Sequence, residues 1–233
     1  MLTDKQIGDF KHHYQTESQR FRILPPGIYP DRKYSQQPEN SRLIVREKNG
    51  IGLDQFLLLQ VGSDFKRKGV PRTLQALASL PDVIRHRTRL MIVGQDKADR
   101  YRAQARQLGV EEQVQFFSGR DDVAELMSAA DLLLHPAVQE AAGIVLLEAV
   151  VAGLPVLTTE VCGYAGYINA AQCGVVIPEP FEQENLNTAL FDALQNNEQR
   201  SRWAGNARHF ADTKDLYSLA DKAADIILGP KND

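Results

Sequence analysis

The sequence has few cysteines and no long apolar run, and each shortage excludes a class of protein. Cys162 and Cys173 are the only two cysteines among 233 residues. They form no C-x-x-C motif and no histidine pair accompanies them, so neither a disulfide framework nor a zinc site is indicated. No apolar run approaches the roughly 20 residues that span a bilayer, and residues 1–10 lack the regions of a signal peptide. We therefore expect a cytoplasmic chain without a membrane span.

An excess of one charge is also lacking. Lys and Arg total 27 against 30 Asp and Glu, for a net charge of −3, which gives no general reason to expect nucleic acid or an anionic membrane as a partner. The composition is 43% apolar and 24% charged, which is typical of a globular protein and not of a disordered tail, a collagen or a coiled coil. Any basic binding site must therefore be local.

Short apolar runs alternate with stretches of helical period from about residue 55 onward, and this alternation is typical of βαβ units. The runs are continuous, as expected of parallel strands buried on both faces. We predict six strands, at 56–61, 90–93, 114–117, 131–134, 155–158 and 174–177. Helices are predicted between them at 70–80, 97–108, 121–129, 144–152 and 164–170. The pattern predicts an α/β fold with a doubly wound, parallel, six-stranded, Rossmann-like sheet.

The two ends of the chain follow a different pattern. Residues 183–196, 198–212 and 216–228 are predicted helices, the last with an apolar stripe of Leu216, Leu219, Ala223, Ile226 and Ile227. At the other end, Thr3 begins a capping box for a helix over 4–14, and a short strand is predicted at 22–24. We divide the chain into 1–24, a linker or remnant of another domain, 25–213, the Rossmann-like domain, and 214–233, a C-terminal helix.

The loops after the strands are the places to look for a ligand, because parallel sheets bind at the carboxyl ends of their strands. The loop 62–69, GSDFKRKG, has three adjacent cations leading into a helix, where unpaired N–H groups already favour an anion. A phosphate site and a solvated loop are equally consistent with it. It fits neither a Walker A loop nor a G-x-G-x-x-G fingerprint.

Two further loops carry polar residues. The loop 135–143, HPAVQEAAG, leads into a helix and separates Glu140 from Glu148, whose carboxylates could accept bonds from sugar hydroxyls. On spacing alone, a capping and an exposed glutamate are the favoured interpretation, and His135 is expected to be packed or capped. The segment 118–122, SGRDD, is explained equally well by an aspartate N-cap or by backbone groups that read a base. No Ser-His-Asp or Cys-His arrangement occurs.

Taken together, these segments resemble the retaining GT-B glycosyltransferases of family four. Residues 140–156, EAAGIVLLEAVVAGLPV, are similar to the E-x7-E signature of that family, and 62–69 to its G-x5-K-G loop. Residues 24–28, LPPGI, are similar to its P-x-G-[IV] approach to the C-terminal domain. The stretch from about 20 to 228 further resembles the C-terminal, donor-binding half of the branch that acts in lipopolysaccharide core assembly.

The resemblance implies a role for individual residues. Lys68 and Arg32 would bind the diphosphate of UDP-glucose in place of a metal, so no metal or other cofactor is expected. Glu140 would hold hydroxyls of the transferred glucose, Glu148 the ribose hydroxyls, and the backbone of Arg120 the uracil. The remaining donor-binding residues implied are Gly62, Ser63, Ala141, Ala142, Gly143 and Ile144.

The resemblance also implies what lies elsewhere. The acceptor, an inner-core heptose of lipopolysaccharide, would bind through an N-terminal domain that this sequence does not match, so the chain alone is expected to be inactive. The full-length enzyme would work at the cytoplasmic face of the inner membrane, as a peripheral protein. The stripe on 216–228 would then detach, fold back or drive self-association. A nucleotide-sugar-binding module without catalysis and, more distantly, a nucleotide-sugar epimerase remain alternatives.

Overall fold

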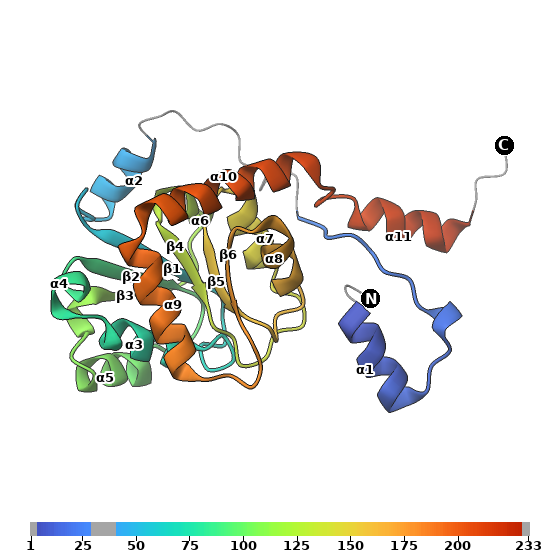
Figure 1. Cartoon of the computed structure of the whole chain (residues 1–233), viewed down its shortest axis with the longest axis horizontal. Helices are drawn as coiled ribbons and strands as arrows, with labels where there is room; N and C mark the ends of the chain where they lie inside the picture. The colour runs from blue at the N-terminus through green and yellow to red at the C-terminus, as the bar shows by residue number, and fades with distance from the viewer. Residues whose placement is uncertain (1–3, 29–40, 230–233) are drawn as a thin grey trace.

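A six-stranded, wholly parallel sheet forms the centre of the protein (Figure 1). The computed structural model describes residues 4–28 and 41–229. The strands are β1 (Phe56–Val61), β2 (Thr88–Val93), β3 (Val114–Phe117), β4 (Leu132–His135), β5 (Val156–Thr159) and β6 (Gly174–Ile177). Their order in the sheet is β3-β2-β1-β4-β5-β6. The predicted doubly wound fold is confirmed, and the strand order reverses direction between β1 and β4.

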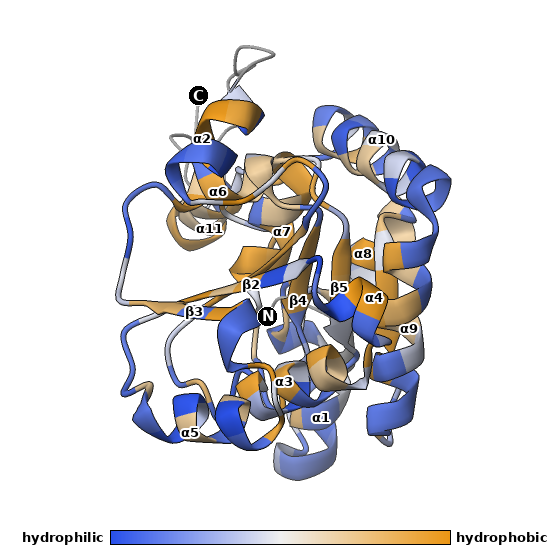
Figure 2. Ribbon diagram, turned by 90° about the vertical axis from the view of Figure 1, so that its left-hand side faces the viewer, coloured by the Kyte–Doolittle hydropathy of each residue, from blue (hydrophilic) through white to orange (hydrophobic). Residues whose placement is uncertain are grey.

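Helices cover both faces of this sheet, and two apolar clusters fill the spaces beneath them. One face carries α2 (Ser41–Lys48), α6 (Val123–Ala129), α7 (Ile144–Val151), α8 (Ala165–Ala171) and α10 (Asn197–Thr213). The other carries α3 (Val70–Ser79), α4 (Asp82–Arg85), α5 (Asp99–Gln107) and α9 (Gln183–Gln195). Successive strand residues enter opposite clusters, with Leu57 and Leu59 in the first and Leu58 in the second. This burial on both sides explains why the strand sequences are continuously apolar, as the hydropathy colouring in Figure 2 shows.

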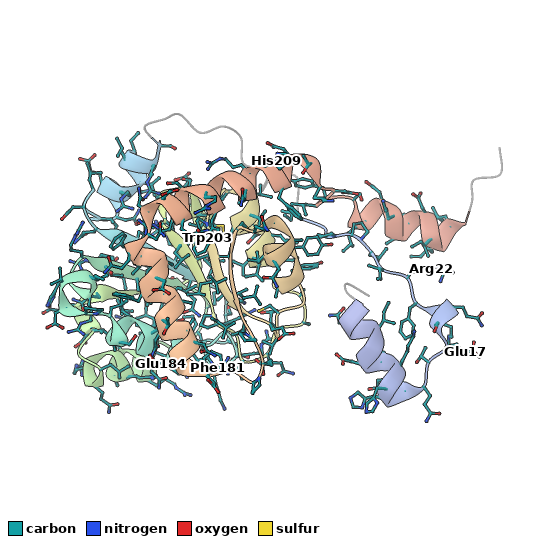
Figure 3. The ribbon with its side chains drawn as sticks, viewed as in Figure 1. Glu17, Arg22, Phe181, Glu184, Trp203 and His209 are labelled. Carbon is teal, nitrogen blue, oxygen red and sulfur yellow. The ribbon has the colours of Figure 1, made fainter. Side chains whose placement is uncertain are left out.

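The helices α9 and α10 are fixed to the sheet by aromatic side chains. Phe181, just before α9, packs against the second cluster, and the Arg72 guanidinium lies 3.6 Å from its ring centroid. The backbone oxygen of Arg72 accepts a hydrogen bond from the Gln183 side chain at 3.0 Å. Trp203 of α10 packs against the same cluster, and Figure 3 labels it together with Phe181. The start of α9 is therefore held against α3, and α10 packs against the same apolar cluster.

The terminal segments depart from expectation in two respects, and two internal helices were not expected. The helix α1 (Asp4–Tyr14) forms as predicted, but 22–24 is not a strand, and only the 3-10 helix at Ser18–Arg20 follows α1. The helix α11 (Leu219–Leu228) begins three residues after the predicted start, because Asp215 accepts the backbone N–H groups of Tyr217 and Ser218. Two short helices, α2 and α4, were not predicted. The proposed Thr3 cap lies outside the described residues.

The apolar stripe of the last helix is divided in two. Leu216 is buried in the first cluster and its carbonyl accepts a hydrogen bond from Ile28 N at 2.9 Å, which joins the two ends of the chain. Beyond it α11 extends away from the α/β body on the same side as α1 (Figure 1), and Ile227 is 81% exposed. In the described ranges, no helix is long and apolar enough to cross a membrane.

A buried charge cluster holds the amino end of β4. Asp131 accepts bonds from Arg42 at 2.6 Å, from Arg46 at 3.3 Å and from the backbone N–H of Leu57 at 2.7 Å. The Arg46 side chain is almost fully buried and also bonds the Ala129 and Gly52 carbonyls. Burial lowers the pKa of Arg46, and the negative charge of Asp131 opposes that shift. The cluster therefore links α2, the approach to β1, and β4.

Replacing Asp131 should destabilise the fold strongly. In Asp131→Asn the Arg46 charge stays buried without its partner, which costs on the order of 3–5 kcal/mol of unfolding free energy. Asp82→Asn is the matched control, because Asp82 also pairs with an arginine, Arg85, but is 76% exposed, and it should cost less than about 1 kcal/mol. Urea denaturation of both variants measures the difference, and equal losses would show that the Asp131 cluster does not hold β4.

Candidate active site

The candidate site lies where the strand order reverses. The loops after β1 and β4 leave adjacent strands there, and in open α/β sheets ligands bind at this point, outside the carboxyl ends of the strands. The backbone N–H of Val138 bonds the Arg67 carbonyl at 2.8 Å, and Arg72 reaches the Ala137 carbonyl at 2.8 Å. The two loops are therefore fixed to one another as well as to the sheet.

This close approach requires glycine at residue 69. Gly69 begins α3 with a left-handed φ of 76°, and a Cβ added there would lie 1.9 Å from the Pro136 carbonyl oxygen. The residue after the lysine of the loop therefore has no room for any side chain. Because residue 69 has no side chain, the loop that carries Lys68 can lie directly against the loop after β4.

Lys68 and Glu140 meet across the two loops and form an ion pair. Their side chains are 14% and 9% exposed, respectively. The His135 ring, which is fully buried at the end of β4, has Nε2 at 3.5 Å from the same Glu140 Oε2. Burial alone would raise the pKa of Glu140, but the contact with His135, the hydrogen bond from Lys68 and the Lys68 charge outweigh it and lower that pKa to about 2. At neutral pH Glu140 is therefore a carboxylate, which can only accept hydrogen bonds.

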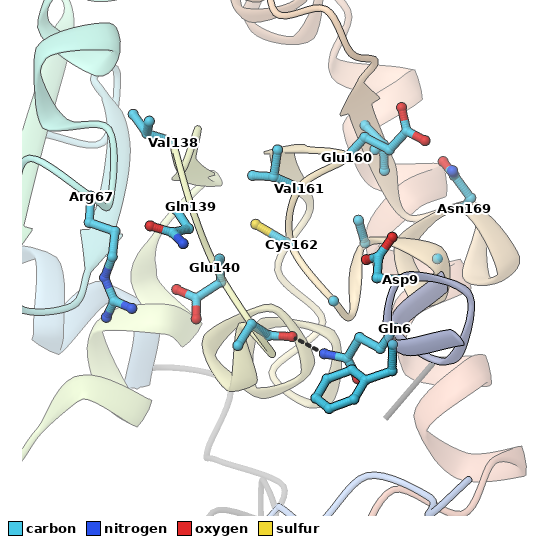
Figure 4. A pocket seen from close by; sticks show the side chains of 16 residues that line it. Gln6, Asp9, Arg67, Val138, Gln139, Glu140, Glu160, Val161, Cys162 and Asn169 are labelled. Atoms are coloured by element: carbon cyan, nitrogen blue, oxygen red, sulfur yellow. Dashed lines mark hydrogen bonds between the residues drawn. The ribbon is translucent and has the colours of Figure 1, made fainter. Parts of the chain in front are cut away.

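A cavity of about 810 Å³ opens beside Glu140 (Figure 4). One wall comes from the loops after β4 and β5, and the opposite wall from Gln6, Asp9 and Phe10 of α1. The Gln6 side chain donates a hydrogen bond of 2.8 Å to the Ala141 carbonyl, drawn as the dashed line in Figure 4. The polar side chains of the lining are carboxylates, amides and one guanidinium: Gln6, Asp9, Arg67, Gln139, Glu140, Glu160 and Asn169. Such groups suit a ligand with many hydroxyls.

Most of the remaining predicted donor-binding residues lie around this cavity or the lysine loop. Gly62 packs against the aliphatic part of Lys68, and Ser63 accepts a hydrogen bond from Gln95 N at 3.0 Å. Ala141 lines the cavity, and Ala142 and Ile144 flank Gly143, which begins α7 at a left-handed φ of 84°. No side chain caps this helix start. Glu148 lies half-buried in the second turn of α7.

Among the predicted residues that the structure describes, Glu140 and Ala141 line the cavity itself, and Arg120 lies at a different place. Arg32 lies outside the described residues. The Arg120 side chain makes two hydrogen bonds to Asp122, one to Asn49, and stacks over Phe117, beside a separate hollow of about 540 Å³. Asp122 occupies the N-cap position of α6 but its carboxylate binds Arg120 instead of capping, so the alternative of an ordinary aspartate cap is wrong.

Nothing in the sequence pattern pointed to the wall made by α1. Gln6 and Asp9 belong to a helix assigned to a linker or remnant, and nothing in their spacing pointed to a ligand. His135 was expected to be packed, and it is buried, but its contact with Glu140 was not foreseen. Across residues 4–28 and 41–229, no three His, Cys, Asp or Glu side chains are grouped as a metal site would require.

Comparison with known proteins places the chain in a family. The family described as glycosyl transferases group 1 matches residues 41–210. The chain belongs to this family. It is 69% identical, over 98% of its length, to the lipopolysaccharide glucosyltransferase WaaG of Escherichia coli K12, of which it spans 61%. It is 29% identical to a D-inositol 3-phosphate glycosyltransferase of Corynebacterium glutamicum, covering 96% of this chain and 54% of that protein.

Solved structures agree on the fold. The crystal structure of WaaG, described as a glycosyltransferase involved in lipopolysaccharide biosynthesis, superposes with a TM-score of 0.94 over 99% of this chain and 62% of that one, at 68% identity. The Anabaena protein Alr3699/HepE, solved with UDP-glucose, has a TM-score of 0.79 over 91% of this chain and 58% of that one, at 21% identity. The predicted relation to GT-B glycosyltransferases is confirmed. The chain spans about three fifths of the WaaG length.

Acid titration should reveal the ion pair. The folded-state pKa of Glu140, about 2, lies below its ordinary value of 4.5, so the ionised carboxylate stabilises the fold fully above about pH 4.5 and this contribution is lost as the pH falls toward 2. Lys68→Met should move the Glu140 pKa up toward 4.5, as followed by ¹³C NMR of the glutamate carboxyls. Lys66→Met, at an exposed lysine of the same loop, should leave it unchanged. An unshifted Glu140 in Lys68→Met would contradict the pairing.

Proposed function

We propose that this chain is the donor-binding part of a retaining glucosyltransferase that transfers glucose from UDP-glucose to an inner-core heptose during lipopolysaccharide core assembly. The observation that carries the proposal is the pairing of Lys68 with Glu140 at the reversal of the strand order. Glycosyl transfer from a nucleoside diphosphate needs a cation for the departing diphosphate and an acceptor for the sugar hydroxyls. These two groups have the required charges and lie on adjoining loops.

The chemistry follows from the two charges. Negative charge develops on the diphosphate as the glycosidic bond breaks, and a fixed cation such as Lys68 stabilises it. Arg32 is proposed as a second cation at the same diphosphate. Glu140 would accept hydrogen bonds from the glucose hydroxyls, Glu148 from those of the ribose, and the backbone at Arg120 would contact the uracil. Retention of the anomeric configuration would follow from attack on the same face, with a phosphate oxygen accepting the acceptor's proton.

Relatives support the choice of donor and acceptor. The protein that shares 69% of its residues with this chain bears the name lipopolysaccharide glucosyltransferase, and a chain of the same fold has been solved with UDP-glucose. We propose that the heptose acceptor binds partly through residues outside these 233, because transfer needs both substrates held together within one closed cleft. The chain alone would then bind the donor without transferring glucose. The complete enzyme would act at the cytoplasmic face of the inner membrane.

Removing the lysine charge should weaken nucleotide binding. A charge-assisted contact is worth about 1.5–3 kcal/mol, so Lys68→Ala should raise the Kd for UDP on the order of tenfold or more, as measured by calorimetry. Lys66→Ala removes an exposed cation two residues away and should change the Kd by less than about threefold. Addition of EDTA should have no effect. Unchanged UDP affinity in Lys68→Ala, or binding that depends strictly on Mg²⁺, would remove the proposed phosphate site.

The two glutamates should differ in what they recognise. Glu148→Ala should weaken UDP and UDP-glucose alike, because the ribose is common to both ligands. Glu140→Ala should weaken only UDP-glucose, by on the order of tenfold, because UDP lacks the sugar. Glu112→Ala removes an exposed glutamate just before β3, outside the cavity lining, and is the control that should affect neither ligand. Equal losses of UDP affinity in both glutamate variants would refute the assignment.

A further inference from the structure

His135 is a buried polar side chain whose ring nitrogens are left without ordinary partners. It ends β4, is 0% exposed, and neither Nδ1 nor Nε2 makes a hydrogen bond within the described part of the chain. A buried polar group without a partner is costly, so its presence needs an explanation. Its backbone carbonyl is satisfied, since it accepts bonds from Ala137 N at 2.8 Å and from the Thr158 hydroxyl at 3.0 Å. Only the imidazole remains to be explained.

The surroundings of the ring decide where its proton lies. Burial lowers the pKa of His135, so the ring is neutral at neutral pH and carries one N–H. On Nδ1 that proton would find no acceptor among the described residues. On Nε2 it points to the Glu140 carboxylate, 3.5 Å away, which is slightly beyond a good hydrogen bond. That carboxylate oxygen is occupied at the same time by the Lys68 ammonium.

We propose that His135 is a positioning residue, whose Nε2–H takes hold of the Glu140 carboxylate when the donor diphosphate draws Lys68 away. This rests on the proposed function, because Lys68 cannot serve the diphosphate and remain wholly committed to Glu140. Without a second donor, Glu140 would lose its partner inside a cavity where burial favours the uncharged form. With the imidazole behind it, the carboxylate stays ionised and its free lone pairs remain directed to the sugar hydroxyls.

Several neighbouring groups act on this pair. Around the imidazole they are Glu140 and Lys68 from the loop after β1, and beside Glu140 lies Cys162 from the loop after β5, whose thiol accepts a hydrogen bond from Thr158 at 3.3 Å. Burial raises the pKa of Cys162, so the thiol stays neutral. Farther out, the cavity wall adds the charges of Arg67, Asp9 and Glu160. Lys68 is thus the one cation paired with Glu140 in the described ranges. When Lys68 moves to the diphosphate, His135 is the donor that remains for Glu140.

The ligand-free chain provides the first test. Long-range ¹⁵N–¹H NMR of the imidazoles should show His135 as the neutral Nε2–H tautomer at neutral pH, because burial lowers its pKa. In Lys68→Met the Nε2 proton should shift downfield as Glu140 turns to it. In the double variant Lys68→Met/His135→Gln the Glu140 pKa should remain below that of Lys68→Met/His135→Leu. An Nδ1–H tautomer, a ring that protonates with an ordinary pKa, or equal Glu140 titration in the two double variants would overturn the proposal.

Ligand binding provides the second test. His135→Leu should leave the Kd for UDP within about twofold but raise that for UDP-glucose on the order of tenfold. His135→Gln, which places an amide N–H near the position of Nε2, should recover most of the loss. Thr158→Val disturbs the same buried region without removing the ring and should retain the preference for UDP-glucose. Equal weakening in the Leu and Gln variants, or equal weakening of UDP and UDP-glucose, would mean that His135 serves packing alone.

The two tests separate this proposal from the proposed function. If wild-type chain binds neither UDP nor UDP-glucose, the donor assignment fails, and the NMR result on the ligand-free chain still decides whether His135 holds Glu140. If UDP-glucose binds and the tautomer is Nδ1–H, the function stands and the positioning role is lost. Should His135→Leu fail to fold, the wild-type tautomer and the milder His135→Gln variant carry the decision.

Discussion

A carboxylate that stays ionised while largely buried is the constraint on which the arrangement of this site depends. Burial alone would favour its protonated form, and only the Lys68 ammonium and the His135 ring reverse that preference. Each comes from a different strand end, so the loops after β1 and β4 must meet. Gly69 has no side chain because the two loops touch there, and the hydrogen bond between Val138 N and the Arg67 carbonyl holds them together.

The same physical device appears at both ends of β4. Its body is purely apolar, Leu132 to Leu134, and pairs with β1 and β5 inside the sheet. At its amino end Asp131 accepts bonds from two arginines, and at its carboxyl end His135 faces Glu140. Polar contacts therefore mark both ends of the strand, in addition to the register that its pairing with β1 and β5 sets. Precise placement of Glu140 follows from a strand that is fixed at both ends.

The sequence predicted what depends on local pattern and missed what depends on distant partners. Continuous apolar runs revealed all six strands, because burial on both faces leaves no alternation. The stretch 22–24 has the composition of a strand, but none of the strands in the described ranges pairs with it. Helix α2 is short and polar, and it is stabilised by packing against α6. Such a contact between distant residues cannot be read from the local sequence pattern. Spacing suggested the two glutamates, whereas only the folded chain reveals that Lys68 faces one of them and that Arg120 turns to Asp122.

The cavity beside Glu140 is built from two parts of the chain that are far apart in the sequence. The wall that contains Glu140 is carried by the loops that leave β4 and β5. Its opposite wall is carried by α1, a helix outside the α/β body, which reaches the first wall through the Gln6 bond to the Ala141 carbonyl. A ligand extending from Glu140 toward Asp9 would contact both walls at once. Since Ala141 directly follows Glu140, any movement of α1 relative to the sheet acts on the residue beside the carboxylate that the whole site is arranged to keep charged.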